Sequence, residues 1–295
     1  MKFCIIYNKK SAGGRKSKFI KKIYEEIQKN HQIVLFDTKS EKEASKIIKD
    51  VTMNKYNRLI LAGGDGSVSF AVNELLKNNF DPPENFALGY IPAGTVNMLQ
   101  AELNMKKKVS HIVKTLTSNK IQKANLVKIN DKYFILMAGF GWDAQIVQSI
   151  NPSIKKILGK IIFGIKGLQK FIFMNNNKIK VSVDNEEIYA DWILCLNTKF
   201  YAGHYPIANT NIFENKIVSY IFKDLKRIKL LYYIYLIIFY GDLSKSTSVI
   251  TKTSDHLILD GLENDIPIQI DGDDFGNHRR ITILNSNKSL NLITA

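Results

Sequence analysis

Short apolar runs alternate with stretches of helical spacing over the first hundred residues. The runs Lys2–Asn8, Gln32–Asp37, Arg58–Ala62 and Phe86–Ile91 each predict a strand. Between and after them, apolar residues recur at every third or fourth position, which predicts helices. Their apolar faces carry Phe19, Ile20, Ile23 and Ile27; Ala44, Ile47, Ile48 and Val51; Val68, Ala71, Val72, Leu75 and Leu76; and Val96, Leu99 and Leu103. Repeated strand–helix units imply a mostly parallel sheet with helices on both faces.

After about residue 125 the pattern changes to short runs typical of strands, separated by turn residues. We expect an antiparallel β-sandwich there, with helical insertions around 143–173 and 225–240. The expected strands are Leu126–Ile129, Tyr133–Ala138, Lys178–Val183, Trp192–Leu196, Lys216–Phe222, Ser248–Thr253, Ile266–Ile270 and Arg280–Leu284. The sequence therefore predicts an α/β domain over 1–124 and a β-rich domain over 125–295, whose last residues return to the first.

The composition narrows the class of partner. The chain of 295 residues has a formal net charge of +15, and only five of its 42 basic residues are Arg. This charge indicates either an ordinary solvated surface or attraction to an anionic membrane. Nucleic acid is not expected, because no zinc-finger spacing, aromatic RNA-binding motif or helix-turn-helix is present. Cys4 and Cys195 lie in apolar runs far apart, as expected for buried thiols in the cytosol.

One wholly apolar segment, Leu230–Tyr240, has only eleven residues. It is too short to span a bilayer. A helix buried against the sandwich is favoured, while its four tyrosines leave a helix at a membrane interface open. The stretch Lys155–Phe173 mixes Lys with Ile, Leu and Phe, which favours an ordinary amphipathic helix over a membrane-binding one.

Three glycine-bearing turns follow expected strands of the first domain. They are Asn8–Gly14, within a polar loop that we expect to reach Ser17; Gly63-Gly64-Asp65-Gly66-Ser67; and Pro92–Asn97. Ser67 is a preferred N-cap residue for the next helix, and Gly94-Thr95 is expected to open another. Glycine turns at strand ends and helix N-termini can hold phosphate. The alternative is tight turns that need glycine only for their backbone angles.

Other motifs limit and extend this hypothesis. The chain has no GxxxxGK[ST], and no GxGxxG follows its first strand, so neither a P-loop nor the usual dinucleotide fingerprint is present. A late acidic turn, Asp271-Gly272-Asp273, places two carboxylates at i and i+2, where both can point to the same side. By itself this turn is more typical of a solvated hairpin.

Taken together, the motifs resemble the diacylglycerol kinase catalytic domain family of lipid kinases, which also includes sphingosine kinases. The resemblance rests on Gly63–Ser67 for its GGDGT, Pro92–Asn97 for its P-x-G-T-x-N and Asn8–Gly14 for its N-terminal loop. It continues into the second half of the chain, in Gly139–Ala144, Asn197–Pro206 and Gln269–Asp273. It implies a first domain like those of NAD kinase and phosphofructokinase.

The resemblance also implies roles for residues. ATP and Mg²⁺ are the expected cofactors, and Asp65 would orient Mg²⁺, through water. Asp273 stands at the family's proton acceptor, with Asp271 as the alternative. The implied nucleotide-binding residues are Asn8, Ser11, Gly13, Thr38, Gly63, Gly64, Asp65, Gly66, Ser67, Gly94, Thr95 and Asn97.

Several positions depart from the family pattern. Ser67 replaces Thr, and Asp273 replaces Glu, which withdraws the carboxylate by one methylene. Lys9 stands where Pro is common. Glu214-Asn215 stands where an Asp-Gly pair is usual near a metal of some bacterial members, which puts Glu214 as a metal ligand in doubt.

The favoured interpretation is an ATP-dependent lipid kinase that phosphorylates a diacylglycerol-like hydroxyl. It would be cytoplasmic and peripheral at the inner membrane surface, with a lipid substrate and a transient contact with anionic membrane as its partners. The sequence leaves a homodimer open. Two alternatives remain: an NAD kinase, which shares the GGDG turn, and a catalytically silent protein that binds lipid or nucleotide.

Overall fold

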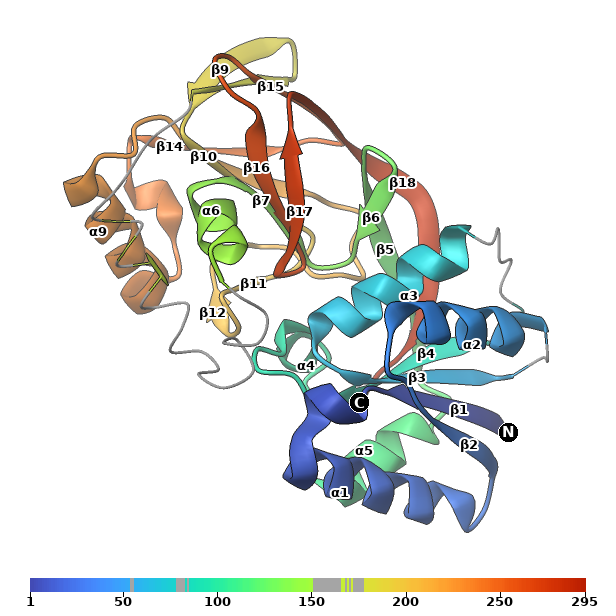
Figure 1. Ribbon diagram of the computed structural model, residues 1–295. Coiled ribbons are helices and arrows are strands. Elements are labelled where there is room, and N and C mark those ends of the chain that lie inside the picture. The colour runs from blue at the N-terminus through green and yellow to red at the C-terminus, as the bar shows by residue number, and fades with distance from the viewer. Residues whose placement is uncertain are drawn as a thin grey trace. The chain divides into compact units, whose positions relative to one another are not determined.

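The computed structural model describes residues 1–53, 56–77, 83, 85–150, 166, 167, 169, 171 and 178–295 (Figure 1). These residues form two compact units. Unit 1 comprises Met1–Ala124 and Lys288–Ala295, and unit 2 comprises Asn125–Asn287. The chain thus leaves unit 1 once and returns to it for its last residues.

Unit 1 is built on a parallel sheet in the order β2-β1-β3-β4. The end of β18 extends the sheet in parallel beside β4, where Leu292 pairs with Leu88. The strands are β1 (Lys2–Tyr7), β2 (Gln32–Asp37), β3 (Arg58–Gly63), β4 (Ala87–Pro92) and β18 (Arg280–Ile293). β1 and β3 are nearly continuous runs of buried apolar residues, as expected for strands covered on both faces.

Helices cover both faces of this sheet, which confirms the expected α/β layers (Figure 1). α1 and α5 lie together on one face, and α2 and α3 lie together on the other. The helices are α1 (Lys9–Gln28), α2 (Glu41–Met53), α3 (Asp65–Lys77), α4 (Met98–Glu102) and α5 (Val109–Leu116). The buried faces of α1 and α2 carry the apolar residues that the spacing indicated, among them Ile20, Ile23 and Ile48.

Three helix starts were predicted wrongly. α1 begins at Lys9, so the expected polar loop through Ser17 is helical instead. α3 begins at Asp65, so Ser67 lies in its first turn and is not its N-cap. α4 begins only at Met98, after bends at residues 94–96. In α1, burial of an apolar face along its twenty residues outweighs the local preference of its first residues for a loop. The starts of α3 and α4 are held by contacts with residues that are distant in the sequence.

Unit 2 is an antiparallel β-sandwich, as expected. One sheet has the order β14-β13-β10-β7-β16-β17, and the other joins the first part of β18 to β15, β8 and β9, with β5 and β6 beside β18. Apolar side chains of both sheets form one core, for example Val181 and Leu259 with Ile193 and Ile268. The strands are β5 (Ile121–Ile129), β6 (Lys132–Phe134), β7 (Met137–Gly141), β8 (Ile179–Val183), β9 (Glu186–Ala190), β10 (Trp192–Leu196), β11 (Phe200–Tyr201), β12 (Tyr205–Pro206), β13 (Val218–Phe222), β14 (Val249–Thr253), β15 (His256–Gly261), β16 (Ile266–Ile270) and β17 (Asp273–His278).

The sequence missed β9, β15 and β17, and also the two-residue strands β11 and β12. β17 has the sequence DDFGNH, which lacks the alternation of a strand, yet it pairs with β16 at the edge of its sheet. Pairing with a neighbour supplied its conformation where local preference did not. The stretch Lys155–Phe173 lies largely outside the described residues.

Two helices of unit 2 matter below. α6 (Trp142–Gln148) follows β7. α9 (Arg227–Tyr235) continues into a π-helical turn, Leu236–Tyr240, and then into a short 3₁₀ turn, Leu243–Lys245. Within the part of the chain that the structure describes, no helix has the length and apolar content needed to cross a bilayer.

Both cysteines are buried, as predicted. Burial raises the pKa of the Cys4 and Cys195 thiols to about 12. Since the thiolate is the reactive form, neither side chain is suited to nucleophilic chemistry.

Candidate functional site

The glycine turns of unit 1 lie where its strand order reverses. From β1 the chain moves to β2 on one side and later to β3 on the other, so the carboxyl ends of β1 and β3 flank a switch point. Open α/β sheets bind ligands at such points. Asn8 follows β1 there, and the Gly63–Ser67 turn ends β3 and begins α3.

Two of the turns contact each other through their backbones. A side chain at Gly94 would place its Cβ 2.3 Å from the Cα of Gly64, and one at Gly64 would lie 3.4 Å from the Cα of Gly94. Ala93 also donates its N–H to the carbonyl of Gly63 at 2.8 Å. Gly94 is therefore required by a close approach of two chain segments, whereas a Cβ at Gly64 would make only an ordinary contact. This result unites the second and third turns in one structure beside the N-terminus of α3.

Asp65 joins these two turns in a second way. Its Oδ2 accepts a hydrogen bond from the N–H of Met98 at 2.8 Å, and its Oδ1 accepts one from Leu99 at 3.1 Å. The carboxylate is buried and thus caps the N-terminus of α4, where an anion is favoured. The carboxylate of Asp65 therefore stabilises the start of α4, in addition to the cofactor role that the sequence predicted for it.

Asn97 fixes the third turn from within. Its Oδ1 accepts hydrogen bonds from the N–H of Gly94 at 3.0 Å and from the hydroxyl of Tyr90 at 2.9 Å. Burial raises the pKa of Tyr90 well above its usual value, and the charge of Asp65 and a hydrogen bond with it raise that pKa further. The phenol thus stays protonated and acts as a donor. Sequence reasoning missed Tyr90, which reads only as a core residue of β4.

The remaining nucleotide-site candidates of unit 1 lie around the same edge. Thr38 follows β2 and donates its N–H and its hydroxyl to the carbonyl of Tyr7, at 2.8 and 3.2 Å. Gly66 and Ser67 form the first turn of α3, and the Ser67 hydroxyl fills the space that a side chain at Gly63 would need. Thr95 lies half-buried in the bend between Gly94 and Asn97, whereas Ser11 and Gly13 lie within α1.

A pair of cations in unit 1 was also missed. The pKa of Lys16, on α1, is lowered by burial and by the charge of Lys107, in the segment before α5. No sequence signal marks this pair among so many lysines.

In unit 2, Asp271 is tied to the backbone of the β6–β7 connection. Its carboxylate accepts N–H groups from Leu136 at 2.9 Å, Met137 at 3.0 Å and Ile135 at 3.2 Å. Asp271 is buried and has a φ of 49°, so the turn after β16 is held in a specific conformation. These contacts indicate a structural role for Asp271.

Asp273 is placed differently, since it is exposed at the start of β17. The turn before it is held by Gln269, whose Oε1 accepts the N–H of Gly272 at 2.9 Å. The other end of Gln269 donates to Oδ2 of Asp143 at 3.3 Å. Asp143 thus connects to the acidic turn through one intervening side chain.

Asp143 is a buried carboxyl in the first turn of α6, and burial raises its pKa to about 7. A side chain at Gly139 would lie 2.1 Å from Oδ2 of Asp143, so that glycine leaves the space in which the carboxyl lies. Perturbed carboxyls are concentrated at functional sites, although structural networks produce them too. The sequence offered the motif Gly139–Ala144 but no sign of this connection.

The described residues contain no group of three or more His, Cys, Asp or Glu side chains that could hold a metal ion. Both oxygens of Asp65 accept one backbone hydrogen bond each, which leaves each oxygen a further lone pair for a water molecule of a Mg²⁺ ion. Glu214 is exposed and accepts a hydrogen bond from the amide of Asn211.

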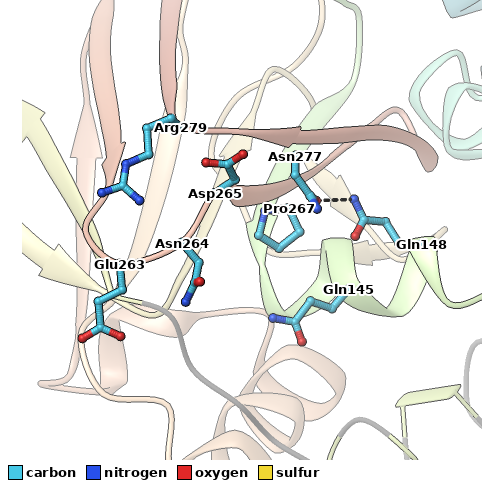
Figure 2. A pocket seen from close by; sticks show the side chains of 8 residues that line it. All are labelled: Gln145, Gln148, Glu263, Asn264, Asp265, Pro267, Asn277 and Arg279. Carbon is cyan, nitrogen blue, oxygen red and sulfur yellow. Dashed lines mark hydrogen bonds between the residues drawn. The ribbon is translucent and has the colours of Figure 1, made fainter.

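An open pocket of about 640 Å³ also lies in unit 2, between α6 and the strands β16 and β17 (Figure 2). Its lining is polar: Gln145, Gln148, Glu263, Asn264, Asp265, Pro267, Asn277 and Arg279. Gln148 spans part of it and donates to Asn277 at 2.9 Å. None of the predicted site residues lines this pocket.

The fold defines a protein with an α/β unit and a β-sandwich unit, and solved structures share it. The crystal structure of a diacylglycerol kinase from Bacillus anthracis str. Sterne matches with a TM-score of 0.76 and 20% identity, covering 100% of this chain and 97% of that one. Residues 2–129 match the sequence profile of the diacylglycerol kinase catalytic domain. This part of the chain belongs to the diacylglycerol kinase catalytic domain family.

Relatives with assigned names agree with this family. The diacylglycerol kinase of Staphylococcus carnosus is 22% identical over 293 residues, which cover 98% of this chain and 94% of the relative. The diacylglycerol kinase of Bacillus subtilis is 23% identical over 196 residues, covering 66% and 63%. The chain spans less than two-thirds of the length of some relatives, 60% for another Staphylococcus carnosus protein. The family and the relatives support a kinase.

Proposed function

We propose that this protein is an ATP-dependent lipid kinase that transfers the γ-phosphoryl group to a diacylglycerol-like hydroxyl at a membrane surface. The observation that carries the proposal is the backbone contact of Gly64 with Gly94 beside the N-terminus of α3, inside the segment that matches the family. Main-chain N–H groups at such a turn suit phosphate oxygens. The match also favours a lipid kinase over an NAD kinase.

In this proposal the two units have separate tasks. Residues 1–124, with the chain end that returns to them, bind the nucleotide through Asn8, the Gly63–Ser67 turn and the Pro92–Asn97 turn. The lysines at 16 and 107 add positive charge for the phosphates. The β-sandwich unit receives the lipid acceptor.

The proton of the lipid hydroxyl passes to a carboxylate of the acidic turn. The hydroxyl oxygen forms a bond to the γ-phosphorus while the bond between that phosphorus and the bridging oxygen breaks, and ADP leaves. We assign the proton to Asp273, because it is exposed while Asp271 is engaged with three backbone N–H groups. Mg²⁺ ordinarily neutralises the nucleotide phosphates in such a reaction.

The location follows from the substrate. A lipid acceptor lies in a bilayer, and a net charge of +15 favours the anionic inner surface of a membrane. Buried thiols suit the reducing cytoplasm. We therefore propose a peripheral protein on the cytoplasmic side.

The test is a transfer assay with radiolabelled ATP and three acceptors: dioctanoylglycerol, sphingosine and NAD. Label in dioctanoylglycerol that disappears with Asp273→Asn is the expected result. Label in NAD would replace the proposal with an NAD kinase. Nucleotide binding without transfer to any acceptor would support the silent binding protein.

A further inference from the structure

The outer face of α9 and its π-helical turn carries a continuous set of exposed apolar side chains. We name it the outer α9 surface, and its members are Ile228, Leu231, Tyr232, Tyr235, Ile238, Phe239 and Tyr240. Ile228 is 83% exposed and Phe239 is 72% exposed. Exposed apolar side chains are normal singly, but a contiguous group marks an interaction surface.

The inner face of the same helix is firmly packed on unit 2. Leu230, Tyr233 and Leu236 are buried, the ring of Tyr233 lies 5.0 Å from that of Phe222, and its hydroxyl donates to the carbonyl of Asp224 at 3.1 Å. α9 is thus apolar on both sides, while among the residues that the structure describes only its inner side packs against the protein. A surface helix of a globular protein ordinarily has a polar outer face.

The aromatic residues of this surface form a cluster with polar edges. The ring of Tyr235 lies 5.2 Å from Phe239 and 5.4 Å from Tyr240, and the two tyrosine hydroxyls are 3.3 Å apart. The ammonium of Lys245 lies 3.7 Å from the centre of the Tyr240 ring. Tyrosines with a nearby lysine are typical of the boundary between acyl chains and headgroups.

The charges around the outer α9 surface indicate which kind of partner binds it. The segment Lys223–Lys245 holds five cations and two carboxylates, a net charge of +3, and the whole chain has +15. An anionic bilayer complements this charge and accepts the apolar side chains. A second copy would bring the same positive charge against itself and is disfavoured.

We propose that the outer α9 surface docks on an anionic lipid bilayer, with Ile228, Leu231 and Phe239 in the acyl boundary and the flanking lysines at the headgroups. This inference rests on the proposed function and extends it. It assigns the membrane contact to one helix of unit 2, whereas the net charge of the chain does not indicate which surface makes that contact. An interfacial helix of this kind binds through apolar area and electrostatic attraction together.

The test is co-sedimentation with vesicles of equal parts phosphatidylglycerol and phosphatidylcholine. For Ile228→Ser with Phe239→Ser, we expect partitioning to fall roughly tenfold or more, because two large apolar side chains no longer leave water. The matched control is Met53→Ser, a residue that is 71% exposed on α2 of unit 1. It should partition like wild type, and all variants should keep the wild-type melting temperature.

A second variant reports insertion directly. Phe239→Trp should show blue-shifted emission on vesicles and quenching by brominated acyl chains, above the background of the two buried native tryptophans. Unchanged sedimentation of the serine variant, or emission of the introduced indole that does not shift on bound protein, would overturn the proposal. So would a wild-type dimer in light scattering that the serine variant converts to monomer, since the surface would then join two copies.

The outcome is separable from that for the proposed function. Vesicle binding is measured without ATP, and transfer is measured on dioctanoylglycerol below its aggregation threshold, without vesicles. The serine variant should keep its rate on this dissolved acceptor. Absence of transfer in wild type would count against the kinase, while loss of docking concerns the outer α9 surface alone.

Discussion

Asp65 and Met98 are 33 residues apart, yet the carboxylate of the first accepts the backbone N–H of the second at 2.8 Å. This bond ties the first turn of α3 to the start of α4. The Gly63–Ser67 turn and the Pro92–Asn97 turn are therefore parts of one structure, each of which depends on the other. The carboxylate of Asp65 thus stabilises the two turns themselves.

This bond predicts that Asp65 affects stability as well as activity. Asp65→Ala leaves the N–H groups of Met98 and Leu99 without their buried acceptor, so we expect a loss of about 1–3 kcal/mol of unfolding free energy. Nucleotide affinity and transfer should fall with it. Asp65→Asn keeps one acceptor oxygen and should recover part of the stability in chemical denaturation. Wild-type stability with Asp65→Ala would contradict the capping role.

The contact of the two glycine turns predicts the effect of a single methyl group. Gly94→Ala puts a Cβ 2.3 Å from the Cα of Gly64, and separating these backbones should cost about 1–3 kcal/mol and weaken nucleotide binding. Gly14→Ala is the control, because Gly14 lies in α1 and the methyl group added there would have no atom within 4 Å. It should stabilise the protein by up to about 1 kcal/mol. Thermal melts and nucleotide titration measure both.

The two aspartates of the acidic turn should separate in their effects. Asp273→Asn should lower turnover roughly 100-fold or more, the range of a lost general base, without changing the melting temperature. Asp271→Asn should instead lower stability, because it disturbs three backbone hydrogen bonds. If Asp271→Asn abolished turnover at unchanged stability, the proton acceptor would move to Asp271.

Asp143 predicts a pH dependence of stability. Its pKa is about 7 in the folded protein, against an ordinary value of 3.8, so the folded state holds a proton that the unfolded state loses between these values. The associated stability is present at low pH and is lost as the pH rises from about 4 to about 7.

Asp143→Asn should remove this dependence, because an amide does not ionise. Melting temperatures between about pH 4.5 and 8 should therefore fall less steeply for Asp143→Asn than for wild type. Asp131→Asn, at an exposed position in the β5–β6 turn, is the control and should keep the wild-type slope. If the melting temperatures of Asp143→Asn and wild type changed equally with pH, burial would not raise the pKa of Asp143.

Much of the fold was predictable, because each strand or helix that buries one face has its apolar residues at a characteristic spacing. The four parallel strands of unit 1 and the change to antiparallel strands after residue 125 follow from it. The errors occurred where distant contacts outweighed local preference. α4 starts at Met98, where Asp65 caps it, and β17 forms from a polar hexapeptide, because β16 supplies its hydrogen bonds.

The sequence by itself determined the family, through glycines and carboxylates whose order and spacing are specific, and the layers, through the apolar periodicity. Tertiary structure alone decided what those carboxylates contact. Asp65 meets α4, Asp271 meets a strand connection 134 to 136 residues away, and Asp143 reaches the acidic turn through Gln269. The reason is physical: a buried carboxylate takes the N–H groups that folding brings to it, and these come from positions that local sequence does not specify.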